Sequence, residues 1–168
     1  MVNFTLMESN IFILSQPIRS GKSTHLLKWI KTQQHIGGVL TPDIDSKRML
    51  YAISTAEFFP LEVPADAIDQ IQIGRFYFST TTFEMANELL LKEARENRDL
   101  LIIDEVGKLE MENKSGFEPA LSNIISLYRQ QSGTSKLLLV VRDTLLNAAI
   151  EHYELADAEI VNLDFFKA

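Results

Sequence analysis

Short apolar runs alternate with helix-like patterns along this chain. The run NIFILS at residues 10–15 precedes a stretch, 23–33, in which Leu26, Leu27, Trp29 and Ile30 recur at helical spacing. Further strands are predicted at residues 71–78, 100–104, 136–141 and 158–163, and further helices at about 79–98, 117–131 and 143–151. Alternating strands and helices predict an α/β fold with a mostly parallel sheet between two helical layers.

The early part of the chain departs from this alternation. Residues 38–54 contain two apolar runs around the turn-forming segment PDIDS, which predicts an antiparallel hairpin, with an exposed strand continuing to about residue 61. The pair Gly37-Gly38 is expected to end the first helical pattern. Residues 56–72 carry Pro60 and Pro64 without a sustained period, so we expect a mobile loop and the best candidate for a lid.

Composition narrows the class of protein. The 168 residues, 46% hydrophobic and 23% charged, fit a single globular domain spanning 1–168. The net charge of −7 and the lack of a basic stripe argue against nucleic acid as a partner. The absence of cysteine excludes disulfides and thiolate metal sites. The first residues lack the pattern of a signal peptide and no run is long enough to span a bilayer, so we expect a cytoplasmic protein without a membrane anchor.

The segment between the first strand and the first helix has the chemistry of a phosphate-binding loop. Residues 16–23 match GxxxxGK[ST] except at the first glycine, and the strand before and helix after favour this reading over an ordinary helix-capping turn. Lys22 is expected to reach the β- and γ-phosphates and Ser23 to bind Mg²⁺. The predicted nucleotide-binding residues are Gln16, Pro17, Ile18, Arg19, Ser20, Gly21, Lys22, Ser23 and Thr24. For Arg19, a solvated side chain is the alternative to a phosphate contact.

Gln16, which replaces the first glycine of the motif, has two possible conformations. With a positive φ it would be strained by roughly 1 to 2 kcal/mol and would weaken nucleotide binding. As an unstrained residue at the end of the strand, it would require a slightly reshaped loop.

An acidic pair follows the apolar strand at 100–104, where ligands bind in open α/β sheets. Asp104 is predicted to hold Mg²⁺, and Glu105 to orient and deprotonate the attacking water. Arg142 follows the strand KLLLVV at the same edge and could neutralise charge on the γ-phosphate. The alternative for Arg142 is an ion pair with Asp143 or Glu151.

Other charged residues receive no chemistry from the sequence. Lys108 and Glu110 are interpreted as a surface ion pair on a glycine-containing turn. A nucleotide role for Arg48 in the hairpin is left as the less favoured alternative. The three histidines have no metal-ligand spacing.

Together, QPIRSGKST, the hairpin segment, IGRFYF and above all DEVGKLE at 104–110 resemble the nucleoside-triphosphatase family first described from thermophiles. The last segment is similar to that family's D-E-(I/V)-G-x-M-E, with Leu109 in place of methionine. The resemblance implies a RecA-like P-loop NTPase fold, Mg²⁺ as cofactor, and slow hydrolysis of ATP, GTP and other nucleoside triphosphates. Gln16 and the turn PDIDSKR, which lacks the family's usual glycine and glutamate, depart from the pattern and bear on turnover more than on binding.

The sequence leaves two other functions open. A regulatory protein that binds nucleotides with little turnover would keep the same loop, and Gln16 favours it mildly. A small-molecule kinase would use residues 56–72 as an acceptor pocket, although no second substrate motif is present. Protein partners are not indicated by the sequence.

Overall fold

The structure is a computed structural model that describes residues 8–17 and 20–167. The strands of the large sheet are β1 (Ile11–Gln16), β2 (Ile36–Leu40), β3 (Asp43–Ile44), β4 (Lys47–Ala52), β5 (Glu57–Pro60), β8 (Leu100–Val106), β9 (Lys136–Arg142) and β10 (Glu159–Val161), and β6 (Gln70–Ile73) and β7 (Phe76–Ser79) form a separate pair. The α-helices are α1 (Lys22–Trp29), α2 (Thr80–Glu93), α3 (Lys108–Asn113), α4 (Ala120–Gln130) and α5 (Leu146–His152). Short 3₁₀ helices are η2 (Ile30–Thr32), η3 (Asp143–Leu145) and η4 (Leu163–Phe166).

The large sheet has a parallel part and an antiparallel part. Its order is β10-β1-β9-β8-β2-β4-β3, with β5 paired to β4. The strands from β10 to β2 pair in parallel, whereas β4 is antiparallel to β2, β3 and β5. This confirms the predicted mixed sheet with an early antiparallel hairpin. β9 lies between β1 and β8, so the ends of these three strands share one edge.

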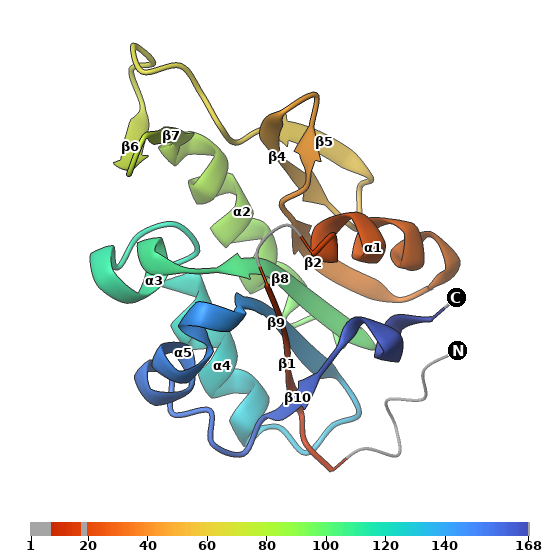
Figure 1. The fold of residues 1–168 in the computed structure, drawn as a ribbon. Helices are drawn as coiled ribbons and strands as arrows, with labels where there is room; N and C mark the ends of the chain where they lie inside the picture. The colour runs from red at the N-terminus through yellow and green to blue at the C-terminus, as the bar shows by residue number, and fades with distance from the viewer. Residues whose placement is uncertain (1–7, 18–19, 168) are drawn as a thin grey trace.

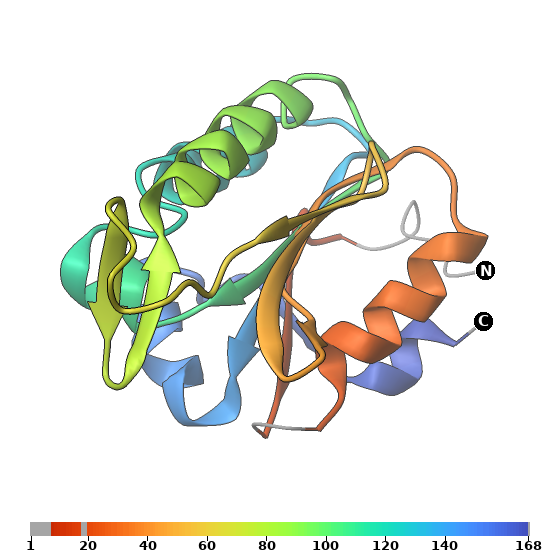
Figure 2. The ribbon, with the colours of Figure 1, turned by 90° about the horizontal axis from the view of Figure 1, so that it is seen from above.

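Helices cover both faces of the sheet. Figure 1 shows α1 on one side of the strands and α2, α4 and α5 on the other, and Figure 2 shows the sheet between α1 and α2. Successive residues of β8 alternate between the two layers: Ile103 belongs to the buried cluster under α2 and α4, while Ile102 belongs to the cluster under α1. The predicted three-layer sandwich is therefore confirmed. Because both faces of the strand are covered, its sequence is continuously apolar.

Several local predictions need correction. The predicted strand at 71–78 is a hairpin of two strands, β6 and β7, which turn at Gly74 and Arg75. Residues 56–72, expected to be a loop, contain β5 and the start of β6. The pair Gly37-Gly38 lies inside β2, because the helical segment already ends at Thr32. The short helix α3, which begins three residues after Glu105, was not among the predicted helices.

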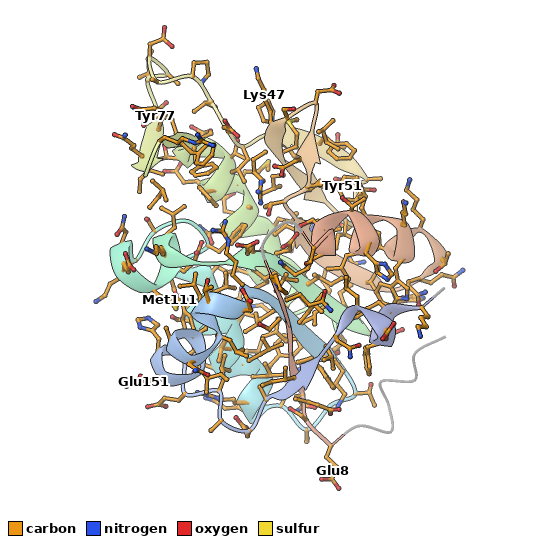
Figure 3. The ribbon with its side chains drawn as sticks, viewed as in Figure 1. Glu8, Lys47, Tyr51, Tyr77, Met111 and Glu151 are labelled. Carbon is orange, nitrogen blue, oxygen red and sulfur yellow. The ribbon has the colours of Figure 1, made fainter. Side chains whose placement is uncertain are left out.

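The β6–β7 hairpin lies at one end of α2 (Figure 1). Ser79 joins the two elements, and its side chain accepts a hydrogen bond from the amide of Thr82, which caps the start of α2. Figure 3 shows Tyr77 on this hairpin and Met111 on α3. Among the described residues, no helix combines the length and apolar character needed to cross a bilayer.

Candidate nucleotide-binding site

The phosphate-loop motif connects β1 to α1, as the sequence predicts. Gly21 has a φ of 81° and immediately precedes the helix, a left-handed conformation that glycine adopts without a Cβ penalty. Among the described residues, no side chain caps this end of α1, so its first amides are available to an anion. Ser20 and Thr24 are exposed, and Ile18 and Arg19 lie outside the described residues.

The lysine of the loop is folded back onto the loop itself. Lys22 is 5% exposed, and its Nζ donates hydrogen bonds to the carbonyl oxygens of Gln16 at 3.0 Å and Pro17 at 2.9 Å. An ammonium group held by neutral carbonyl oxygens can exchange them for negatively charged phosphate oxygens, with which its hydrogen bonds are stronger. The loop therefore holds the ammonium group of Lys22 within itself.

The structure decides between the two conformations considered for Gln16. It is the last residue of β1, paired in register with Arg142 of β9. The described non-glycine residues with positive φ do not include Gln16. Gln16 is thus an unstrained strand residue, and the strained alternative is wrong.

Asp104 is a completely buried carboxylate at the end of the central strand β8. The amide of Thr41, which follows the neighbouring strand β2, donates a hydrogen bond to Oδ2 at 3.0 Å. Oδ1 has no hydrogen-bond partner among the described residues. Burial raises the pKa of Asp104 from 3.8 to about 6; the nearby Ser23 hydroxyl opposes that rise, and the charge of Glu105 adds to it. Ser23 and Asp104 are therefore close together, as the metal-site prediction requires.

Glu105 lies at an irregularity in β8. The pairing with β9 passes from Asp104↔Val140 to Val106↔Val141, so Glu105 has no partner in the register, and the Asp104–Glu105 peptide bond is cis. A bulge of this kind turns one side chain away from the regular alternation of the strand. The Glu105 side chain is 16% exposed, compared with the completely buried Asp104.

Arg142 reaches Glu105 from the adjacent strand. Its Nε lies 2.5 Å from Glu105 Oε1, and the guanidinium remains 39% exposed. The alternative partners considered from the sequence, Asp143 and Glu151, are not its ion-pair partners in the structure. Because Arg142 is also paired in register with Gln16, it lies between the phosphate loop and the acidic pair.

Glu110 contradicts the surface ion-pair interpretation. Its side chain is buried, 2% exposed, whereas Lys108 is exposed. It accepts hydrogen bonds from the amides of Gly107 at 2.9 Å and Phe117 at 3.0 Å. Burial raises its pKa from 4.5 to about 7, although both amides favour the ionised form. Glu110 is the third residue of α3, and its bond to the Gly107 amide is one half of a capping box, because glycine has no side chain to supply the other half.

Arg48 and His25 have partners outside the acidic pair. Arg48 forms an ion pair with Asp43 at 2.8 Å, and its charge slightly lowers the pKa of Asp104. Nε2 of His25 lies 2.8 Å from the carbonyl oxygen of Phe166, which joins α1 to η4. Within the described residues, no group of three or more His, Cys, Asp or Glu side chains could hold a metal ion.

Comparison with known proteins gives a family and a fold. The model of the family described as NTPase matches residues 10–166. The nucleoside-triphosphatase THEP1 of Thermotoga sp. (strain RQ2) is 30% identical over 94 residues, which cover 54% of each chain, so the match spans about half the length of that curated relative.

Two solved structures share the architecture. The crystal structure of THEP1 from the hyperthermophile Aquifex aeolicus aligns with a TM-score of 0.66 at 15% identity, covering 91% of this chain and 89% of the other. The solution structure of a human cancer-related nucleoside triphosphatase aligns with a TM-score of 0.62 at 18% identity, covering 92% and 88%. At these identities the similarity establishes the fold.

Proposed function

The chain belongs to the NTPase family, and on that premise we propose that it hydrolyses nucleoside triphosphates, ATP and GTP among them, to diphosphate and phosphate with Mg²⁺ as cofactor. The relative from Thermotoga sp. is a protein named nucleoside-triphosphatase, which supports this proposal. The observation that carries it is the meeting of three strand ends: β1 leads into the loop with Lys22, β8 ends with Asp104 and Glu105, and β9 ends with Arg142.

Ser23 and Asp104 fit a Mg²⁺ ion. The buried Oδ1 of Asp104 lacks a hydrogen-bond partner among the described residues, and an uncompensated carboxylate oxygen is costly unless a cation or donor approaches it. Mg²⁺ prefers hard oxygen ligands and is usually bound by one or two protein groups together with water and substrate phosphates. When bound, the ion would neutralise charge on the phosphate oxygens.

The cations of the site would bind and orient the triphosphate. We expect Lys22 to release the carbonyl oxygens of Gln16 and Pro17 and bind phosphate oxygens. The Nε of Arg142 engages Glu105, and the other N–H groups of its exposed guanidinium can bind a phosphate at the same time. Arg142 can therefore position Glu105 and neutralise charge on the γ-phosphate together.

Glu105 would accept the proton of the attacking water. It lies next to Asp104, at the edge that the phosphate loop also reaches, and it is partly exposed, so a water molecule has access to it. Attack of water on the γ-phosphorus forms the new P–O bond, breaks the bond to the β-phosphate oxygen and leaves a proton on Glu105. The diphosphate then departs as the leaving group.

One observation favours the second function, a regulatory nucleotide-binding protein with little turnover. The ion pair with Arg142 occupies Oε1 of Glu105, so this oxygen does not accept a hydrogen bond from a water molecule while the pair is formed. The binding groups of the loop would be unaffected by this pairing. Turnover, not nucleotide binding, therefore distinguishes the two functions.

Phosphate release from a panel of Mg²⁺-bound nucleoside triphosphates tests the proposal. The native protein should release phosphate, and Glu105→Gln should retain nucleotide affinity while losing about 10² to 10⁴ in turnover, the range expected for a general base. Glu112→Gln, which changes an exposed carboxylate on α3, is the matched control and should retain native turnover.

Each outcome has a distinct meaning. Binding without phosphate release by the native protein would support the regulatory function. Equal turnover by the native protein and Glu105→Gln would show that another group activates the water.

A further inference from the structure

The Glu110 carboxylate connects the end of β8 to a segment of backbone that lies further along the chain. Its Oε2 accepts the hydrogen bond of the Gly107 amide, and its Oε1 accepts that of the Phe117 amide. Gly107 follows Glu105 by two residues, whereas Phe117 begins the segment that leads into α4. One buried carboxylate thus bridges two loops.

The Phe117 end of this bridge is fixed by helix α2. The ring of Phe117, 1% exposed, meets Phe83 of α2 edge to face with the ring centroids 5.2 Å apart. Asn87, also on α2, donates a hydrogen bond from Nδ2 to the carbonyl oxygen of Gly116 at 2.9 Å. Since α2 packs against the sheet, the Phe117 amide is a fixed point for the bridge.

The carboxylate of Glu110 fills the space beside Gly116. Gly116 has a φ of +65°, and a Cβ built on it would lie 2.2 Å from Glu110 Oε1. Hydrogen bonds to an ionised group are about twice as strong as neutral ones, and leaving either amide unpaired would be costly. The carboxylate therefore has a tightly defined position.

The bridge begins two residues after Glu105, at a point where the strand pairing is irregular. It has no partner in the β8–β9 register, so the ladder does not fix its backbone directly. The residues that follow it are fixed: Val106 is completely buried, and Gly107 donates its amide to Glu110 and accepts the amide of Met111 at 3.2 Å. The Glu105 backbone is thus held by Asp104 on one side, in register with Val140, and by Val106 and Gly107 on the other, while Arg142 holds its side chain.

We propose that Glu110 is a positioning residue, which directs the Glu105 carboxylate by holding Gly107 against Phe117. The inference rests on the proposed role of Glu105 in hydrolysis. Both carboxylate oxygens of Glu110 accept backbone amides, so we expect it to act through the backbone and not through contact with the nucleotide. Its loss should consequently slow turnover without weakening nucleotide binding.

Three substitutions test the bridge in different ways. Glu110→Gln keeps one acceptor, Glu110→Ala removes both, and Gly116→Ala displaces the carboxylate without removing it. We would measure kcat with Mg²⁺·ATP and the Kd of a non-hydrolysable ATP analogue at pH 8. A misplacement of about 1 Å can cost about 100-fold in rate. We therefore expect kcat to fall about tenfold in Glu110→Gln and Gly116→Ala and about 100-fold in Glu110→Ala, with Kd changed less than about threefold.

Glu93→Gln is the matched control. Glu93 is 1% exposed and accepts a hydrogen bond from the amide of Gly38 at 2.6 Å, so it is also a buried carboxylate bound to a backbone amide. This bond holds β2, however, and not the turn at Gly107. Its kcat should stay at the native value. If Glu93→Gln loses as much kcat as Glu110→Gln, the effect is general destabilisation and the inference is wrong.

The remaining outcomes separate the inference from the proposed function. Native kcat in folded Glu110→Gln and Gly116→Ala would overturn the inference while leaving the function intact. If the native protein releases no phosphate, the proposed function fails, and amide hydrogen exchange at Gly107 then tests the bridge by itself. Exchange should be faster in Glu110→Gln than in the native protein. Unchanged exchange would overturn the inference.

Discussion

Replacing Glu110 by glutamine should remove a large part of the pH dependence of folding stability. Glu110 has a pKa of about 7 in the folded protein and an ordinary value of 4.5, chiefly because burial disfavours its charged form. Between these values the folded state holds a proton that the unfolded state has released, so stability is highest at low pH and is lost as the pH rises towards about 7. At about 1.4 kcal/mol per pKa unit, the rise corresponds to about 3 kcal/mol.

The comparison between variant and native protein isolates this contribution. Asp104, whose pKa burial raises from 3.8 to about 6, changes stability in the same direction, so the native curve alone would combine both groups. Urea unfolding at intervals from pH 4.5 to pH 8 gives the free energy of unfolding of each protein. The native protein should lose about 3 kcal/mol relative to Glu110→Gln across this range.

Parallel curves for the two proteins would refute the reasoning. In that case either the carboxylate is solvated in the folded protein or its two amide hydrogen bonds fully offset its burial. Glu112→Gln on the same helix controls for the loss of an exposed negative charge.

Three further predictions concern the site itself. Lys22→Ala should abolish measurable triphosphate binding in calorimetry while the protein stays folded; unchanged affinity would contradict the phosphate-loop assignment. Asp104→Asn should weaken binding that depends on Mg²⁺ yet make the nucleotide-free protein more stable by about 1 to 3 kcal/mol at pH 8, as measured by urea unfolding, because a buried charge is removed; a less stable variant would argue against that origin. Gln16→Gly should leave the affinity for a non-hydrolysable ATP analogue equal or lower, since Gln16 is an unstrained strand residue, and about tenfold tighter binding would restore the strained-loop account.

The sequence by itself determined the fold class and predicted the main chemistry of the site. A strand, a Gly-Lys-Ser turn and an amphipathic helix are local patterns, and so is an apolar strand that ends in Asp104 and Glu105. Neighbouring residues in the chain produce these features, whatever packs around them. For the same reason the sequence located Lys22 and Ser23 without locating the contacts they make.

Tertiary structure decided which of these residues meet. Arg142 pairs with Glu105 only because the sheet order inserts β9 between β1 and β8, and no local pattern encodes that order. Glu110 is polar and follows a glycine turn, as a surface residue would, yet the segment at Phe117 buries it and supplies the second amide. The burial and partners of a charged side chain depend on elements distant in sequence, so they follow from the packed fold and not from the residue's own neighbourhood.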